Sequence, residues 1–458
     1  MEHRTEKDFL GHKQVPQDAY FGIHTQRSVE HFSFSGKKPP KICIHKMFEI
    51  KKACAKANLE LRLLDQKKAH AIFKACDEAL TGKFDAEFPI GLFQAGSATS
   101  THMNVNEVIA NRATELLDGK KGEYLVHPND DVNKGQSTND VVPTAVKMGN
   151  LELAEKLEKA LEELSKELER KAKEFHDVVK TGRTHLQDAV PITLGQEFGA
   201  YAACTKKHLH KIKHAKSFLL ELALGGNAIG TGINTLPAFR AKAIGNLSKQ
   251  TGKKFHKAEN GMEQVQFFSD VNAFSAAVSG LAADLNKISN DLRLLASGPT
   301  AGFAEITLPP VEPGSSIMPG KINPSMLEAI NMACVQAMAN HFAVTTASAS
   351  GQLELNTFMP LIAYMSIESI ELMESSCRAL AWTVKGTKAN KEKCLEYAEK
   401  NPSIATALNP VIGYEKASEV VKEALKTGKT IKQVTVEKGL LTKSEADKLL
   451  DAKRLAKA

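Results

Sequence analysis

The chain has 458 residues, of which 42% are hydrophobic and 25% charged, and its formal net charge is +7. This length predicts two or three domains, and the composition is that of an ordinary soluble globular protein. One Trp and six Tyr are too few aromatic residues to alternate with the basic ones. A nucleic-acid surface is therefore excluded, and small anions are the expected partners.

The seven cysteines are odd in number and scattered, and none has metal-ligand spacing. Free thiols in a reducing compartment are therefore expected. The first residues, MEHRTEKDFLG, lack the apolar run of a signal peptide, and no stretch approaches the length of a membrane span. We expect a cytoplasmic protein with neither a membrane nor a nucleic acid as partner.

The first predicted domain, residues 1–137, is mixed but mostly helical, with helices expected at 46–64 and 106–117. From residue 138 the pattern changes to long amphipathic helices. Between residues 146 and 175, four leucines fall on one helical face while Glu and Lys fill the others. These leucines are Leu157, Leu161, Leu164 and Leu168.

The strongest apolar repeat lies at residues 262–297, where spacings of three and four alternate without a break. Its members are Val271, Phe274, Val278, Leu281, Leu285, Ile288, Leu292 and Leu295. Such a repeat is typical of helices that pack at a shallow angle. Further helices are predicted at 195–224, 325–350 and 352–384. We therefore expect a mainly α chain with a five-helix bundle over 138–386 and a small helical domain at 387–458. Apolar and small residues on several faces predict oligomerisation.

The segment 314–324, GSSIMPGKINP, has neither a helical nor a strand period. It gathers Ser, Lys and Asn between glycines and prolines, so it offers a proton-relaying hydroxyl beside two groups that can bind a carboxylate. A plain connector is the ordinary interpretation of such a composition. A phosphate-binding loop is excluded, because five residues instead of four separate Gly314 from Gly320, and Ile322 follows Lys321.

Three other segments share this polar, Gly-rich character: residues 96–107, 127–140 and 182–188. Each adjoins a predicted helix, so capping is the simpler interpretation for any one of them. Donors at helix N-termini also bind anions. Four such segments in one chain therefore favour a site for a small dicarboxylate.

Together these segments resemble the fumarase/aspartase superfamily. GSSIMPGKINP resembles its signature, and GRTHLQDAVPITLGQEF, QSTND, NVNEVIANRA and GTGINT resemble other blocks of class II fumarases and aspartate ammonia-lyases. The similarity runs from about residue 6 to residue 417. It implies a homotetramer with a central twenty-helix bundle, whose active sites are each built from three subunits.

The resemblance also implies residue roles in a β-elimination. Ser315 is the expected base, and Lys321 and Asn323 are expected to bind the carboxylate that becomes an aci-carboxylate. His185, with Glu328 as its partner, is expected near the leaving group. Further substrate contacts are implied for Ser97, Thr99, Ser137, Thr138, Asn139 and Thr184. A secondary anion site is implied at His127, Asn129 and Asp130, and catalysis is expected to need no metal or organic cofactor.

The resemblance allows two leaving groups, ammonia and water. Blocks at 387–394 and from 414 onward resemble aspartate ammonia-lyases, and they are longer than the fumarase-like blocks at 25–28, 127–130 and 222–226. We therefore expect conversion of L-aspartate to fumarate and ammonia. The alternative is fumarate hydratase, acting on L-malate. An inactive helical structural protein is the remote alternative, which the presence of Ser315, Lys321 and His185 opposes.

Three residues depart from the pattern of both enzymes. Ala98 stands where Gly is usual, His102 where Asn is usual, and Asn227 where Thr is usual. Ala98 adds a methyl group beside the substrate hydroxyls, and His102 adds a titratable group near them. Drift outside the pocket is the simpler interpretation, and an altered substrate range is the alternative.

Overall fold

The computed structural model describes residues 2–456, whose contacts separate into two compact units. The first comprises Met1–Glu158, His210–Gly280 and Gln336–Met373, and the second comprises Lys159–Leu209, Leu281–Val335 and Glu374–Ala458. No helix among the described residues is long and apolar enough to cross a membrane. The predicted domain boundaries at residues 137 and 386 stay predictions.

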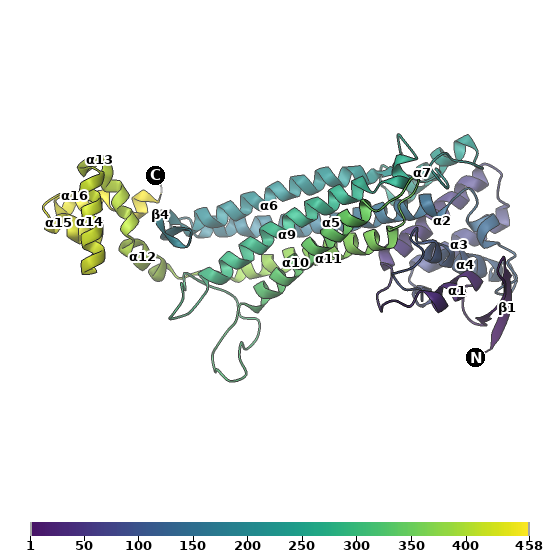
Figure 1. The fold of residues 1–458 in the computed structure, drawn as a ribbon, viewed down its shortest axis with the longest axis horizontal. Helices are drawn as coiled ribbons and strands as arrows, with labels where there is room; N and C mark the ends of the chain where they lie inside the picture. The colour runs from purple at the N-terminus through teal and green to yellow at the C-terminus, as the bar shows by residue number, and fades with distance from the viewer. Residues whose placement is uncertain (1, 457–458) are drawn as a thin grey trace. The chain divides into compact units, whose positions relative to one another are not determined.

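Five helices are the longest among the described residues (Figure 1). They are α5 (Thr138–Glu174), α6 (Leu194–Ser217), α9 (Ser269–Leu295), α10 (Ser325–Ser348) and α11 (Met359–Gly386). The mainly α fold with five long helices is therefore confirmed. The four leucines predicted on the apolar face of α5 are fully buried, and the eight apolar residues of the α9 repeat are at most 5% exposed.

Polar side chains link each of the five long helices to two others. The links are Ser165–Thr205 (α5–α6), His208–Asp284 (α6–α9), Asn286–Asn331 (α9–α10), Asn340–Glu368 (α10–α11) and Asn150–Ser366 (α11–α5). Each link pairs a buried or half-buried donor with an acceptor, so the atoms that form the links keep a hydrogen-bond partner on burial. The links also fix which helices are neighbours.

Shorter elements complete the first unit. They are β1 (His3–Asp8), β2 (Gly11–Pro16), α1 (Ile23–His31), α2 (Lys41–Glu60), α3 (Gln66–Leu80), η1 (Asp85–Glu87), α4 (Thr99–Glu115), η2 (Pro128–Val132), η3 (Phe218–Leu220), β5 (Glu221–Leu222), α7 (Pro237–Thr251), β6 (His256–Lys257) and α8 (Glu263–Gln266). β1 and β2 form an antiparallel pair, and β5 pairs with β6 in parallel.

The remaining elements belong to the second unit. They are β3 (Val179–Thr184), β4 (Gln187–Thr193), β7 (Ile306–Thr307), β8 (Lys388–Ala389), α12 (Lys391–Lys400), η4 (Pro402–Leu408), α13 (Asn409–Ile412), α14 (Tyr414–Thr427), α15 (Ile431–Glu437), α16 (Lys443–Leu449) and α17 (Ala452–Leu455). The C-terminal helices bury a small apolar core of their own around Leu408, Val420 and Leu450.

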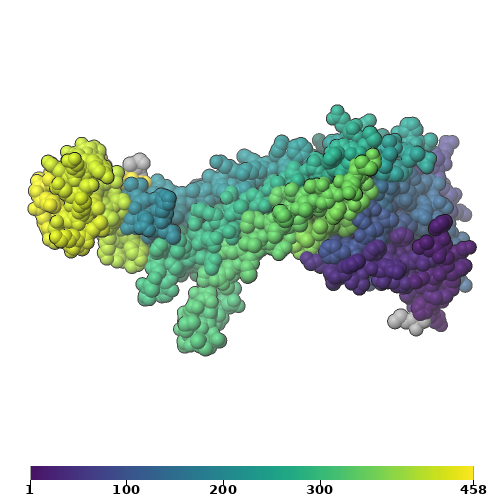
Figure 2. Space-filling view, in the orientation of Figure 1, coloured from purple at the N-terminus to yellow at the C-terminus, as the bar shows by residue number. Residues whose placement is uncertain are grey.

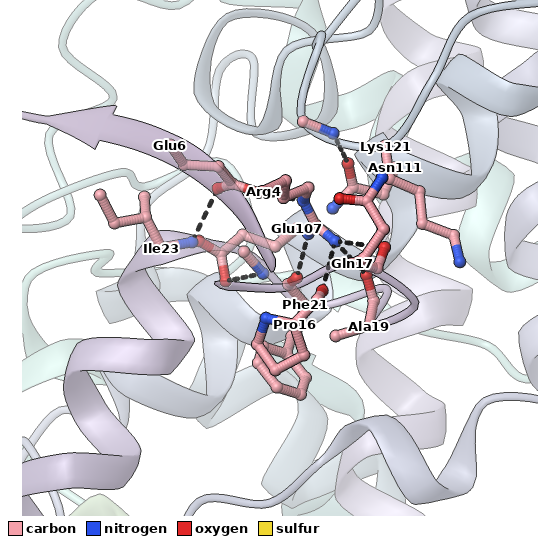
Figure 3. Close-up of polar contacts among 12 residues, drawn as sticks. Arg4, Glu6, Pro16, Gln17, Ala19, Phe21, Ile23, Glu107, Asn111 and Lys121 are labelled. Carbon is pink, nitrogen blue, oxygen red and sulfur yellow. Dashed lines mark hydrogen bonds and ion pairs between the residues drawn. The ribbon is translucent and has the colours of Figure 1, made fainter. Parts of the chain in front are cut away.

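Two buried side chains hold the segment that leads from the N-terminal hairpin into α1 (Figure 3). Arg4 on β1 donates to four backbone carbonyls of residues 16–21 at 2.7–3.0 Å. Glu107 on α4 accepts the backbone N–H groups of Gly22, His24 and Thr25 at the start of α1. A carboxylate there satisfies helix N–H groups that have no partner within the helix. Glu107, in the NVNE block, therefore anchors α1.

Candidate active site

The first group of predicted site residues lies where α4 and α5 begin. We call it the hydroxyl cluster: Ser97, Thr99, Ser137, Thr138 and Asn139. Thr99 is the first residue of α4, and Thr138 is the first of α5. The two starts are joined by His102, whose Nδ1 lies 2.8 Å from Thr138 Oγ1. The structure thus brings two of the polar segments together.

Within this cluster, neighbouring side chains hold one another. Ser97 Oγ lies 2.7 Å from Thr99 Oγ1, and Ser137 Oγ accepts the backbone N–H of Asn139 at 3.3 Å. The Asn139 side chain donates from Nδ2 to the carbonyl of Ala228 at 2.8 Å. Hydroxyl and amide groups therefore meet the N-terminal ends of two helices, an arrangement that favours an anion.

Asp140 secures the start of α5 from below the surface. Its buried carboxylate accepts N–H groups from Ser137, Gly225 and Asn227, each at 2.9 Å. Burial raises the pKa of Asp140, while these three donors act in the opposite direction. Asn227 has a φ of 60°, a left-handed conformation in which Asn is tolerated far better than a β-branched Thr. This accounts physically for Asn at the third departing position.

Ala98 occupies the N-cap of α4 with φ 65° and ψ 29°, and its side chain provides no capping hydrogen bond. This left-handed conformation is one that glycine adopts without steric cost, whereas a Cβ makes it unfavourable. The Ala in place of the usual Gly therefore introduces local backbone strain between Ser97 and Thr99 of the hydroxyl cluster.

The predicted secondary anion site is a compact turn at the start of η2. His127 Nδ1 accepts the backbone N–H groups of Asn129 and Asp130 at 3.3 and 3.2 Å. The backbone N–H of His127 in turn donates to Asp131 Oδ2 at 2.8 Å. His127 is half-buried, and Asn129 and Asp130 are exposed. The three predicted residues therefore share one local surface of the first unit.

In the second unit, Thr184 and His185 lie at the tip of the β3–β4 hairpin. Thr184 pairs with Gln187, so His185 and Leu186 form a two-residue turn with φ of 55° and 59°. Positive φ at both central residues defines a turn that normally carries Asn or Gly. Strain of this kind persists where the surroundings enforce it, and it is common at functional sites. Both predicted residues are exposed in this chain.

A buried ion network holds the base of this hairpin. Glu305 has no exposed surface. Arg183 donates to both of its carboxylate oxygens at 3.0 Å, and Lys180 Nζ lies 3.1 Å from Oε2. The Arg183 guanidinium also lies 4.2 Å from the centre of the Phe303 ring. Lys180 is shared with Glu197 at 2.8 Å. Arg183 thus fixes the strand that presents His185.

The segment 314–324 stands out from the surface as a loop (Figure 2). Its two ends are joined, because Gly314 N–H donates to the Lys321 carbonyl at 2.8 Å and Asn323 Nδ2 donates to the Gly314 carbonyl at 2.7 Å. A Cβ on Gly314 would approach Asn323 N to 2.6 Å. Gly314 is therefore needed for close backbone approach, while Gly320, with φ 78° and open space around it, provides the turn.

Ser315 lies inside this loop with its hydroxyl oxygen facing backbone donors. Its Oγ accepts the N–H groups of Ile317 at 3.2 Å and Met318 at 3.0 Å. Two N–H groups aimed at one oxygen stabilise negative charge on it. This geometry suits a serine that must lose its proton.

Lys321 and Asn323 line one side of an open cleft of about 750 Å³. Glu328 on α10 and Arg293 on α9 line it as well, and they form an ion pair at 3.4 Å. Arg293 also donates to Asn331 at 3.1 Å. The cleft is therefore lined by two cations, three Asn side chains and one carboxylate.

The predicted residues thus fall into two sets. The hydroxyl cluster and the His127 turn belong to the first unit, and Thr184, His185, the 314–324 loop and Glu328 belong to the second. The described contacts of Glu328 are with Arg293 and not with His185. Its pairing with His185 stays a prediction.

One group of side chains in residues 2–456 has the atoms of a metal site: Cys204 and His208 on α6 and Asp284 on α9. Asp284 Oδ2 already accepts hydrogen bonds from both, at 3.3 Å from Cys204 Sγ and 2.6 Å from His208 Nε2. These hydrogen bonds give the group a role in joining α6 to α9. None of its members is a predicted site residue.

Sequence reasoning missed several side chains that support these groups. Lys51 on α2 is fully buried and reaches His102, and Arg183 and Glu305 fix the hairpin. Of these side chains, only Lys51 could have been found from the sequence. It lies on the face that also carries Met47, Cys54 and Asn58, where a charged residue interrupts the helical apolar pattern.

The structure thus combines a bundle of long helices with a serine-bearing loop and a cleft lined by Lys321, Asn323 and Arg293. Comparison with known proteins identifies the family. The family described as "Lyase" matches residues 11–339, and the family described as "Fumarase C C-terminus" matches residues 404–457. The chain belongs to the fumarase/aspartase superfamily of lyases.

Curated relatives span almost the whole chain. The class II fumarate hydratase of Thermus thermophilus is 46% identical over 100% of this chain and 99% of the relative. That of Halobacterium salinarum is 48% identical over 98% and 96%. The aspartate ammonia-lyase of Bacillus subtilis is 41% identical over 100% and 96%.

Two solved structures resemble the chain closely. A class II fumarase of Schistosoma mansoni has a TM-score of 0.97 at 37% identity, covering 99% of both chains. A structure entitled fumarate lyase:delta crystallin from Brucella melitensis bound to cobalt has a TM-score of 0.95 at 45% identity. It covers 99% of this chain and 100% of its own.

Proposed function

We propose that the chain is a fumarate hydratase, which converts L-malate to fumarate and water and catalyses the reverse hydration. The observation that carries the β-elimination is the pair of backbone N–H groups aimed at Ser315 Oγ. The identity of the leaving group is supported by the relatives, because those at 46% and 48% identity are named class II fumarate hydratase.

Ser315 takes the proton from the carbon next to a carboxylate. That C–H bond is only weakly acidic. The reaction therefore needs an activated base and stabilisation of the dianionic aci-carboxylate that forms when the proton leaves. The N–H groups of Ile317 and Met318 stabilise the serine alkoxide. Lys321 and Asn323 bind the aci-carboxylate. The hydrogen bond from Asn323 to the Gly314 carbonyl holds these two residues close to Ser315.

The hydroxyl cluster binds the rest of the substrate, and Thr184 and His185 act at the leaving group, with Glu328 as the partner of His185. His127, Asn129 and Asp130 form a secondary anion site. No metal or organic cofactor takes part in this scheme.

These residues come together when the chain assembles into a homotetramer whose active sites are each shared by three subunits. One face of α10 supports this assembly, since Met332, Val335 and Phe342 expose 68%, 57% and 75% of their surfaces. Apolar residues at this spacing along one helix are typical of a face that packs against another helix.

Aspartate ammonia-lyase is the second candidate, supported by the 41% identity to the Bacillus subtilis enzyme. One assay distinguishes the two functions. L-malate and L-aspartate are offered separately to the purified protein, and fumarate is followed by its ultraviolet absorbance. Fumarate from malate alone supports the hydratase, fumarate from aspartate alone supports the ammonia-lyase, and fumarate from neither overturns both.

Ser315→Ala tests the mechanism against a matched control, Ser316→Ala. Ser315 Oγ accepts two N–H groups, whereas the neighbouring Ser316 is exposed. Removing the base should lower kcat at least about 100-fold, and the Ser316 variant should keep kcat near the wild-type value. Full turnover by Ser315→Ala would exclude this serine as the base.

A further inference from the structure

A chain of hydrogen bonds runs from the buried Lys51 through His102 to Thr138 of the hydroxyl cluster. Lys51 Nζ lies 2.7 Å from His102 Nε2, and the other ring nitrogen, Nδ1, lies 2.8 Å from Thr138 Oγ1. Lys51 Nζ also donates to Asn133 Oδ1 at 2.7 Å. The chain joins α2, α4 and α5, and it ends on a hydroxyl that the proposed function assigns to the substrate.

The interior members of this chain are shielded from solvent, since Lys51 and His102 are 0% and 1% exposed. Burial lowers the pKa of Lys51 to about 7. Burial and the neighbouring Lys51 charge hold the pKa of His102 well below its ordinary value. The imidazole is therefore neutral near pH 7, and Lys51 is the member whose charge changes there.

Titratable groups face this pair from four helices. Lys51 faces Cys54 on its own helix, Cys76 on α3 and Asp140 on α5, and His102 faces His24 on α1. Burial raises the pKa of both thiols, so they are uncharged near neutral pH. Asp140 favours the charged form of Lys51 and opposes the effect of burial.

The charge of Lys51 determines the direction of these hydrogen bonds. An ammonium group has no lone pair, so charged Lys51 can only donate to Nε2. The single proton of the neutral ring must then be on Nδ1, where it donates to Thr138 Oγ1. The Thr138 hydroxyl is thereby left to donate its own hydrogen to an acceptor such as a substrate carboxylate.

A neutral Lys51 amine can also accept a hydrogen bond. The ring proton can then be on Nε2, and the Thr138 hydroxyl donates back to Nδ1. In that state the hydroxyl presents a lone pair to the substrate, which disfavours a carboxylate. The distances are the same in both states, and only the hydrogens change place.

We propose that Lys51 and His102 are positioning residues that orient the Thr138 hydroxyl and so control affinity for the substrate carboxylate. The proposal rests on the proposed function for the role of Thr138. The proposal also assigns a role to His102, which stands where Asn is usual. An Asn at this position carries its amide where His carries Nδ1, and it has no second nitrogen to reach Lys51.

The test is the pH profile of KM for the better of L-malate and L-aspartate, measured between pH 6 and 9. In the wild type, KM should rise as pH passes 7, because Lys51 loses its charge. Lys51→Met should raise KM at pH 6 about tenfold, the cost of one misdirected hydrogen bond, with kcat nearly unchanged. Its KM should not vary with pH and should equal that of the wild type at pH 9.

Two further variants separate positioning from a purely structural role. His102→Asn should keep a low KM at pH 6 but lose the rise above pH 7, because its amide still reaches Thr138 while the link to Lys51 is gone. Lys46→Met removes another buried lysine of α2, which pairs with Glu49 and not with the hydroxyl cluster. It should keep the wild-type KM profile, whatever its effect on stability.

The outcomes distinguish this proposal from the proposed function. A wild type that turns over neither substrate overturns the function. An active wild type whose KM rise persists in Lys51→Met or in His102→Asn overturns the positioning role alone. If Lys51→Met does not fold, His102→Asn carries the comparison. Neutron diffraction at pH 6 gives a readout independent of activity: a deuteron on Nδ1 of His102 is expected, and one on Nε2 would overturn the proposal.

Discussion

Glu305→Gln should destabilise the protein strongly, because it removes a buried charge on which two cations depend. Glu305 has no exposed surface, and it contacts Arg183 through both oxygens at 3.0 Å and Lys180 at 3.1 Å. Breaking a buried ion pair by neutralising one partner costs roughly 3–5 kcal/mol. The variant keeps the shape of the side chain, so packing contributes little to the change.

The lower end of this range is expected, since both cations keep other partners. Lys180 retains Glu197 at 2.8 Å, and Arg183 retains the face of the Phe303 ring at 4.2 Å. We therefore expect the free energy of unfolding to fall by about 3 kcal/mol. Because Arg183 precedes the turn that carries His185, kcat/KM should also fall.

Equilibrium urea denaturation of the wild type and the variant measures this loss. Glu396→Gln is a matched control, since Glu396 also pairs with two basic residues, Lys393 and Lys400, but on the exposed surface of α12. Surface pairs of this kind contribute little, so the control should denature like the wild type. If the free energy of unfolding of Glu305→Gln falls by less than about 1 kcal/mol, the ion network around Glu305 is not needed for stability and the reasoning is refuted.

Three other predictions follow from single features of the structure. Ala98→Gly should stabilise the protein by about 1 kcal/mol in urea denaturation, because it relieves the left-handed strain at φ 65°; Ala110→Gly, within α4, should destabilise it instead. Phe342→Asp, on the exposed face of α10, should reduce the mass measured by light scattering. Leu425→Asp, which is similarly exposed on α14, should leave the mass unchanged. The free energy of unfolding should also rise between pH 7 and 10.5, by at most about 1.4 kcal/mol per pH unit. The pKa of Lys51 is lowered to about 7 in the folded protein, whereas the unfolded chain keeps the ordinary value of 10.5. Between these two values only the unfolded chain binds the proton, so raising the pH favours the folded state. Lys51→Met should lack this component, and an unchanged slope would contradict it.

Much of the helical framework could be predicted because apolar periodicity is a local property. The α9 repeat predicted a helix over 262–297, and the observed helix is Ser269–Leu295. Boundaries were less accurate. α5 begins at Thr138 instead of residue 146, since its first turns carry polar and β-branched residues in place of the leucine repeat. The N-terminal hairpin β1–β2 was not predicted, because its strands lack apolar alternation.

The comparisons altered one expectation from the sequence. The aspartase-like blocks lie mostly outside the predicted site, so they carried little information on the leaving group, and the relatives favour the hydratase. The membership of the superfamily, in contrast, followed from short motifs that include the site residues themselves.

By itself the sequence determined the helical class, the superfamily and the residues expected to react, because periodicity and motifs are contained in short segments. Only the tertiary structure decided what surrounds those residues. Lys51 reaches His102, and His102 reaches Thr138, across separations of 51 and 36 positions. Whether a buried lysine has a partner depends on how distant helices pack, and no local pattern records that packing.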